Sequence, residues 1–301
     1  MKTRWASAAA SAAAATVIVS VSVSGFQFRT RAELVSVDVL VTDSRAPIAG
    51  LTAADFELTD NGTPQTIEQV YVEQLPLNVI MVLDSSASVE GERLRSLKAG
   101  ATTVIDRLRP RDRAALVSFS HRLDLGAALT ADVATLRGSV NALDAAGSTA
   151  LRDAAFAALA LRTADATRTL VLLFSDGLDT SSLLSEDQVL EIARRSDAIV
   201  YAIGIREATV GGRSGFPFRN DAPADHRFLE RLSRETAGRL LYAEQNRDIA
   251  RTFARVLDEF NTRYVLGYAP HGVAGNGWHR LEVRLKKRSG TVLARRGYFA
   301  E

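Results

Sequence analysis

The sequence of 301 residues predicts an α/β protein with a doubly wound, mostly parallel sheet of six strands, flanked by a small β module. Residues 77–83 and 169–174 are nearly unbroken apolar runs, which are typical of parallel strands buried on both faces. Segments with helical periodicity alternate with further short strands. This alternation indicates a parallel sheet covered by helices on both faces.

The helices are expected where apolar residues recur at a spacing of three or four. Pro110 ends the first of them. The expected helices begin near residues 94, 131 and 150 and cover 186–195, 227–236 and 249–260. The remaining strands of the sheet are expected at 114–119, 123–127, 198–203 and 239–242.

Both ends of the chain have the pattern of β structure. Residues 34–42 alternate, with four valines on one face, and Asp60-Asn61-Gly62 is a hairpin signal that we expect between strands 56–59 and 66–72. After Arg263, strands are expected at 264–268, 278–285 and 291–298, with Trp278 and Tyr298 in a core. We infer one β module built from both ends with the α/β domain inserted between them, although two separate β pieces would have the same pattern.

The first 25 residues have the pattern of a secretory signal. A basic start, MKTRW, precedes an uncharged Ala/Ser/Val stretch and small residues up to Gly25. An uncleaved membrane anchor and a core helix are the alternatives. The expected organisation is a signal peptide at 1–25, an N-terminal β segment at 26–75, the α/β domain at 76–262 and a C-terminal β segment at 263–301. We therefore expect an exported protein, periplasmic or secreted, without a membrane span after cleavage.

Composition excludes several functional classes. Without Lys2 and Arg4, the chain has 35 basic and 35 acidic residues, so it lacks the basic excess of a nucleic-acid binder. It contains no cysteine, which excludes disulfides, thiolate zinc sites and a cysteine nucleophile. The basic residues at 279–296 alternate with apolar ones, which favours the solvated face of a strand over a binding surface for an acidic partner.

A cluster of oxygen-bearing side chains follows the first buried strand. Asp84, Ser86 and Ser88 alternate along a short segment, so their oxygens can converge on one point. Hard oxygen ligands suit Mg²⁺, Mn²⁺ or Ca²⁺. The alternative is that Ser86 or Ser88 caps the following helix.

Two further residues, Thr149 and Asp176, favour the cation site. Asp176 follows the fourth strand of the domain, and the common order 3-2-1-4-5-6 of a doubly wound sheet places the first and fourth strands side by side. Asp84 and Asp176 would then repel each other unless a cation lay between them. Asp179 is close enough in sequence to add a carboxylate, but we expect it to be a solvated loop residue.

The pattern Asp84-Ser85-Ser86-Ala87-Ser88, Thr149 and Asp176 resembles the metal-ion-dependent adhesion site of von Willebrand factor A domains, which integrin I domains share. The resemblance covers about residues 76–262, and the flanking β segments resemble those of exported bacterial proteins with a related domain. It implies that these five residues hold Mg²⁺, or Mn²⁺ or Ca²⁺, directly or through water. It also implies that one coordination position is left for an Asp or Glu carboxylate of a partner protein.

We therefore expect a non-enzymatic adhesion or protein-binding module, or alternatively an assembly subunit of the cell envelope in which the metal mainly stabilises the domain. No catalytic residue is assigned, because the sequence has no GxSxG, phosphate-binding loop or HExxH motif. The four histidines, at positions 121, 226, 271 and 279, are scattered along the chain and receive no role. No organic cofactor is expected.

Overall fold

The computed structural model describes residues 34–44, 46–72, 75–161, 167–205, 226–273 and 275–300. The predicted signal peptide at 1–25 lies outside these residues. In the described part of the chain, no helix is long and apolar enough to cross a membrane.

The central sheet has six strands in the order β11-β10-β9-β6-β7-β8. All neighbours are parallel except β7 and β8, which form an antiparallel pair. In chain order this is 3-2-1-4-5-6, as the sequence predicted. The strands are β6 (Leu77–Asp84), β7 (Arg113–Phe119), β8 (Leu123–Thr130), β9 (Arg168–Phe174), β10 (Ile199–Ile205) and β11 (Leu240–Ala243).

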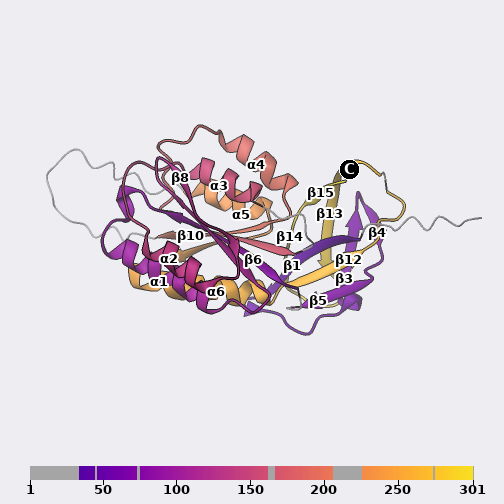
Figure 1. The fold of residues 1–301 in the computed structure, drawn as a ribbon. Helices are drawn as coiled ribbons and strands as arrows, with labels where there is room; N and C mark the ends of the chain where they lie inside the picture. Colours follow the sequence, from indigo (N-terminus) through magenta and orange to yellow (C-terminus); the bar gives the residue numbers. More distant parts are fainter. Residues whose placement is uncertain are drawn as a thin grey trace, which may run out of the picture. The chain divides into compact units, whose positions relative to one another are not determined.

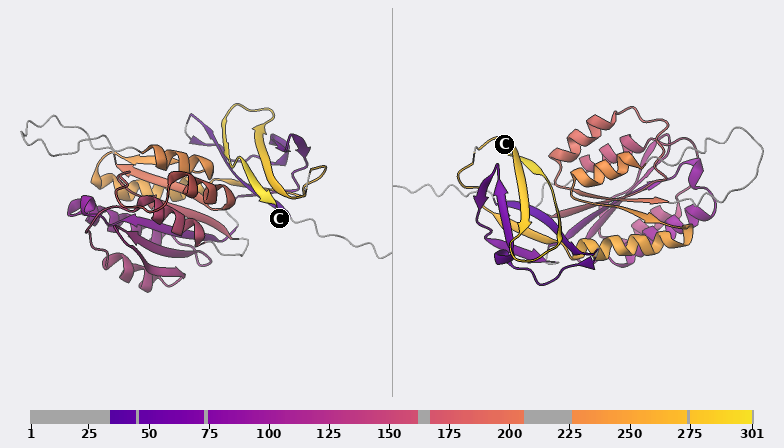
Figure 2. Two further views of the ribbon diagram at one scale, coloured as in Figure 1. Left: turned by 90° about the horizontal axis from the view of Figure 1, so that it is seen from above. Right: turned by 180° about the vertical axis from the view of Figure 1, so that it is seen from behind.

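Helices of the described residues cover both faces of this sheet (Figures 1 and 2). On β6, Val79, Met81 and Leu83 pack against one set of helices, while Ile80 and Val82 pack against the other set. This explains why the strand is an unbroken apolar run. The first set is α1 (Glu92–Asp106), α2 (Val133–Asn141) and α6 (Ile249–Asn261), and the second is α3 (Leu151–Ala160), α4 (Glu186–Arg195) and α5 (Arg227–Glu235).

The remaining strands form two sheets, and each sheet combines strands from both ends of the chain. One has the order β14-β1-β12-β5, with the short β2 (Ala46–Pro47) beside β1, and the other has the order β15-β13-β3-β4. Their apolar side chains share one core cluster. The strands are β1 (Val35–Asp43), β3 (Phe56–Asp60), β4 (Thr63–Gln65), β5 (Gln69–Val72), β12 (Tyr264–Tyr268), β13 (Gly277–Leu285), β14 (Thr291–Ala294) and β15 (Gly297–Ala300).

A buried carboxylate, Asp60, joins the two sheets of this β module. Its Oδ2 accepts hydrogen bonds from the hydroxyls of Tyr268, at 2.8 Å, and Tyr298, at 3.0 Å, and its Oδ1 lies 2.9 Å from Nδ1 of His279. Tyr268 ends β12 of the first sheet, whereas the other three residues belong to the second. Asp60 therefore links segments that are more than 200 residues apart in sequence.

Three predictions about the β module are wrong in detail. Residues 66–72 do not pair across the Asp60-Asn61-Gly62 turn; β4 takes that place, and β5 pairs with β12. Residues 291–298 are two strands in different sheets, because the chain passes from one sheet to the other between β14 and β15. Trp278 is 40% exposed, since its neighbour His279 occupies the inward position on β13.

Charged residues also bridge the β module and the central sheet. Asp38 of β1 accepts a hydrogen bond from Arg168, at the start of β9, at 2.8 Å, and another from Arg263, which is fully buried. Arg263 also donates to the Tyr201 hydroxyl at 3.1 Å, and that hydroxyl donates to Glu259 of α6 at 2.9 Å. Asp38 therefore balances two guanidinium groups at the junction.

Replacing Asp38 by Asn should destabilise the protein by about 3–5 kcal/mol, because it leaves the buried Arg263 guanidinium without its charge partner. The matched control is Asp258→Asn, which removes an exposed ion pair with Arg107 and should cost about 1 kcal/mol or less. Urea unfolding of both variants measures the difference. Equal losses of unfolding free energy in the two variants would show that the buried Asp38 pair stabilises the protein no more than an exposed ion pair does.

Candidate functional site

The candidate site begins at Asp84, the last residue of β6. Asp84 is completely buried, and its carboxylate accepts two hydrogen bonds from the protein. Oδ1 accepts the backbone N–H of Ser86 at 2.9 Å, and Oδ2 accepts the hydroxyl of Ser175 at 2.9 Å. Ser175 directly follows β9, so the adjacency of β6 and β9 in the sheet places it there.

Asp176 brings a second carboxylate to the same edge, and its side chain is 9% exposed. Burial raises the pKa of the Asp84 carboxyl from 3.8 to about 6. The negative charge of Asp176 adds to this rise in pKa, while the hydrogen bonds from Ser86 and Ser175 oppose it. The protein therefore holds two acidic groups close together, and the surroundings of Asp84 disfavour its ionised form.

The hydroxyl oxygens of Ser86 and Ser88 lie 3.0 Å apart. Ser86 precedes the short 3-10 helix Ala87–Val89 in an extended conformation but makes no side-chain capping hydrogen bond, and α1 begins after Gly91. Neither serine caps α1, so the alternative of helix capping is wrong. Neighbouring oxygens in a Mg²⁺ octahedron with bonds of about 2.1 Å are also separated by about 3.0 Å. The spacing thus suits either a hydrogen bond or two adjacent ligands.

Thr149 is placed by the backbone of its loop. The Gly147 carbonyl accepts the N–H of Ala87 at 3.0 Å, which ties the loop to the segment after β6. The Thr149 carbonyl accepts the N–H groups of Thr180, at 2.9 Å, and Ser181, at 3.0 Å, from the segment after β9. Thr149 is 5% exposed, and its loop contacts both the segment after β6 and the segment after β9. Among the described residues, the hydrogen bonds that hold Thr149 are made by its backbone, whose N–H also donates to the Thr180 hydroxyl at 2.9 Å.

Sequence reasoning missed Ser175 and two of the histidines. Ser175 stands next to Asp176 at the end of an apolar run, which is the only signal that pointed to it. The rings of His121 and His226 lie against Gly147 and Gly177, where a Cβ atom would collide with them. Both glycines have a positive φ, at 82° and 86°, so the two loops of the site require glycine for conformation as well as for space.

Asp179 is not the solvated loop residue that the sequence suggested. It forms an ion pair with Arg152, with 3.1 Å between Oδ2 and Nε, and accepts the backbone N–H of Arg152 at 2.9 Å. Although burial opposes the effect, hydrogen bonds from Arg152 and Ser182 lower the pKa of its carboxyl. Asp179 therefore fixes the segment after β9 to the start of α3.

The donor set fits a hard divalent cation. Two carboxylates and three hydroxyls are oxygen donors of the kind that Mg²⁺, Mn²⁺ and Ca²⁺ prefer. No group of three or more His, Cys, Asp or Glu side chains suited to a metal occurs in the described part of the chain. The cation, if bound at Asp84, would therefore depend on hydroxyls as well as carboxylates.

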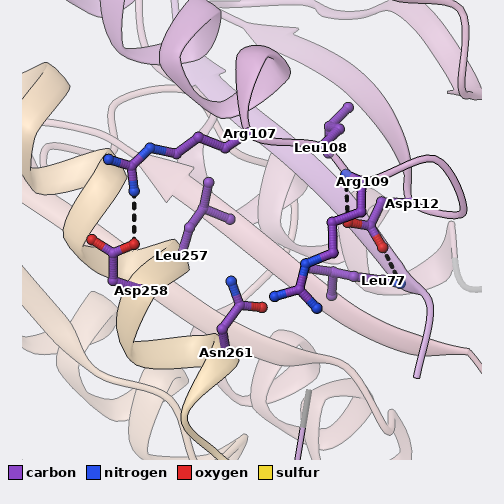
Figure 3. Close-up of a pocket in the computed structure, with 8 residues that line it drawn as sticks. All are labelled: Leu77, Arg107, Leu108, Arg109, Asp112, Leu257, Asp258 and Asn261. Atoms are coloured by element: carbon purple, nitrogen blue, oxygen red, sulfur yellow. Dashed lines mark hydrogen bonds and ion pairs between the residues drawn. The ribbon is translucent and has the colours of Figure 1, made fainter. Parts of the chain in front are cut away.

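A pocket of about 250 Å³ lies at the opposite end of β6, where Leu77 forms part of its wall (Figure 3). The two acidic side chains of its wall already have partners. Asp258 pairs with Arg107 at 2.7 Å, and Asp112 accepts the N–H groups of Leu77 and Arg109, each at 2.9 Å. Since β6 is eight residues long, about 25 Å separates the pocket from Asp84.

Comparisons with known proteins agree with this fold. Residues 79–178 match the family model described as the von Willebrand factor type A domain. The solved structure "von Willebrand factor type A from Catenulispora acidiphila" superimposes with a TM-score of 0.54 at 12% identity, covering 87% of this chain and 75% of that one. At this identity the likeness shows the fold alone.

Curated relatives match over shorter shares of their length. The inter-alpha-trypsin inhibitor heavy chain H2 of Sus scrofa is 24% identical over 208 residues, which are 64% of this chain and 20% of the relative. A Synechocystis sp. protein, "Uncharacterized protein sll0103", is 45% identical over 49 residues, which are 16% of this chain and 12% of that protein. The chain thus spans a fifth or less of these relatives. Residues 79–178 are thus similar in sequence to the von Willebrand factor type A domain, and the central sheet with its helices has the fold of such a domain.

Proposed function

We propose that this protein is a non-enzymatic binding module that recognises an acidic group on a partner protein through a divalent cation. Asp84, Ser86, Ser88, Thr149 and Asp176 would hold the cation, with Mg²⁺ as the first choice and Mn²⁺ or Ca²⁺ as alternatives. The proposed setting is outside the cytoplasm, periplasmic or secreted, because residues 1–25 have the pattern of a secretory signal.

The observation that carries this proposal is the buried Asp84 beside Asp176. Burial and the neighbouring negative charge of Asp176 disfavour the ionised form of Asp84, so the charge of this carboxylate costs stability at neutral pH. A bound cation would supply the missing positive charge. The hydrogen bonds from Ser86 and Ser175 hold the Asp84 carboxylate in one orientation, so little rearrangement is required for binding.

The same donors leave room for an acidic partner. Mg²⁺ takes six oxygens in an octahedron and usually keeps several waters. Three of the five proposed ligands are neutral hydroxyls, so the two carboxylate charges balance a divalent ion without exceeding it. The site with its ion would then carry no net negative charge that repels the carboxylate of a partner. A carboxylate of a partner would replace a water. Ser88, which is exposed, lies on the solvent side of the site.

A titration with Mg²⁺, Mn²⁺ and Ca²⁺ tests the site in the metal-free protein. An ion that binds only the folded state should stabilise it by about 2.7 kcal/mol at a concentration of 100 times the Kd. We expect a saturable rise in melting temperature that Ser86→Ala and Asp176→Ala abolish. Asp144→Ala, which removes an exposed carboxylate from the loop before Gly147, is the matched control and should keep the rise.

A rise of equal size in all variants would indicate non-specific binding of cations and would contradict the site. If the melting temperature of the unaltered protein does not rise and calorimetry detects no heat of binding, the proposal of a cation-dependent module is contradicted. The assembly-subunit alternative is tested separately, since its partner should copurify even in the presence of a chelator.

Replacing Asp84 by Asn should have opposite effects with and without metal. The amide carries no charge, so at neutral pH the metal-free variant should be more stable than the unaltered protein, on the order of 1 kcal/mol. The Mg²⁺-dependent rise in melting temperature should disappear. Thermal unfolding with chelator and with Mg²⁺ measures both effects, and a variant that is less stable in chelator would contradict the claim that the Asp84 charge is costly.

A further inference from the structure

The segment between β9 and α4, which starts at the candidate cation site, exposes two leucines. Leu178 is 42% exposed and Leu183 is 93% exposed. Their neighbour Leu184 packs against the core instead. The segment therefore packs one of its three leucines, partly buried, against the core and leaves the other two exposed, although exposed apolar surface contributes nothing to the core.

Hydrogen bonds fix the backbone that carries these leucines. The two carboxylate oxygens of Asp153, in the first turn of α3, accept the N–H groups of Leu183 and Leu184, each at 2.9 Å. The Ser182 hydroxyl donates to Asp179 at 2.6 Å and accepts the backbone N–H of Arg152 at 3.0 Å. Leu183 is thus held away from the core by its own backbone contacts and does not extend from a loosely attached loop.

The same segment is continuous with the candidate cation site. Leu178 is two residues after Asp176, and its N–H donates to the Asp176 carboxylate at 3.2 Å. Farther along, the Thr149 carbonyl accepts the N–H groups of Thr180 and Ser181. Two of the five proposed cation ligands are therefore attached to the segment that displays the leucines.

We infer that Leu178 and Leu183 form the apolar part of the partner-binding surface, and that the partner presents a large apolar side chain within a few residues of its acidic group. A preorganised apolar contact gains affinity because the segment loses little conformational freedom on binding. The inference rests on the proposed function, since the acidic group is the one that the cation would bind.

Synthetic peptides test this inference directly on the protein from residue 26 onward. The probes are acetylated, amidated glycine peptides that contain one Glu, with Leu placed one, two or three residues after it. Matched peptides replace Leu by Gly or Glu by Gln. In saturating Mg²⁺, NMR titration should show at least one Glu/Leu peptide binding about tenfold more tightly than the Glu/Gly peptide, as expected for burial of a leucine side chain.

Leu183→Ser should reduce the affinity for that peptide to the level of the Glu/Gly peptide and leave the Mg²⁺-dependent melting shift unchanged. Leu161→Ser, at an exposed leucine just after α3, is the matched control and should change neither. Equal binding of Glu/Leu and Glu/Gly peptides, or no effect of Leu183→Ser, would overturn the inference.

The remaining outcomes are also decisive. Binding of the Gln/Leu peptide as tightly as the Glu/Leu peptide would separate the leucines from the cation site and overturn the inference. Sedimentation that shows self-association lost in Leu183→Ser would assign the leucines to a second copy of this chain instead. Failure of the proposed function is distinguishable, because the melting shift with Mg²⁺ would then be absent.

Discussion

The buried carboxylate of Asp84, next to Asp176, is the constraint on which the site depends. The order of the sheet brings the two carboxylates close together, because β6 lies directly beside β9 and both strands end at the same edge. Two protein donors, the Ser86 N–H and the Ser175 hydroxyl, compensate part of the burial. Among the described residues, no cationic side chain contributes to the shift in the pKa of Asp84, and a bound divalent ion would supply the positive charge.

Strand β9 connects this edge to the β module. Its last residue leads into Ser175 and Asp176, while its first residue, Arg168, pairs with Asp38 of β1. The same Asp38 neutralises the buried Arg263, from which the chain enters β12. One strand therefore leads to a pair of neighbouring acidic groups at one end and to a junction of paired opposite charges at the other. The β module is in this way attached to the strand that positions Asp176, one of the five proposed ligands.

The sequence was sufficient to predict the α/β fold from its apolar runs, and the strand order from the common order of doubly wound sheets. The five candidate ligands come from short local motifs and stay a prediction. It did not predict the partners of Asp84 beyond Asp176, since the role of Ser175 depends on which strand lies beside β6. The exposure of Trp278 and the division of residues 291–298 between two sheets depend on which strands pair across the chain. Asp179 and Arg263 were missed for the same reason: each is paired with a residue at least 27 positions away.

The most direct test of the account is to locate a bound ion. Crystals of the protein from residue 26 onward, grown or soaked with MnCl₂, would give an anomalous difference map in which the anomalous scattering of Mn²⁺ distinguishes it from water and Mg²⁺. The account predicts a single strong peak within bonding distance of the oxygens of Ser86 and Ser88 and close to the carboxylates of Asp84 and Asp176. A map with no peak at this edge, or with peaks only at exposed carboxylates, would contradict it.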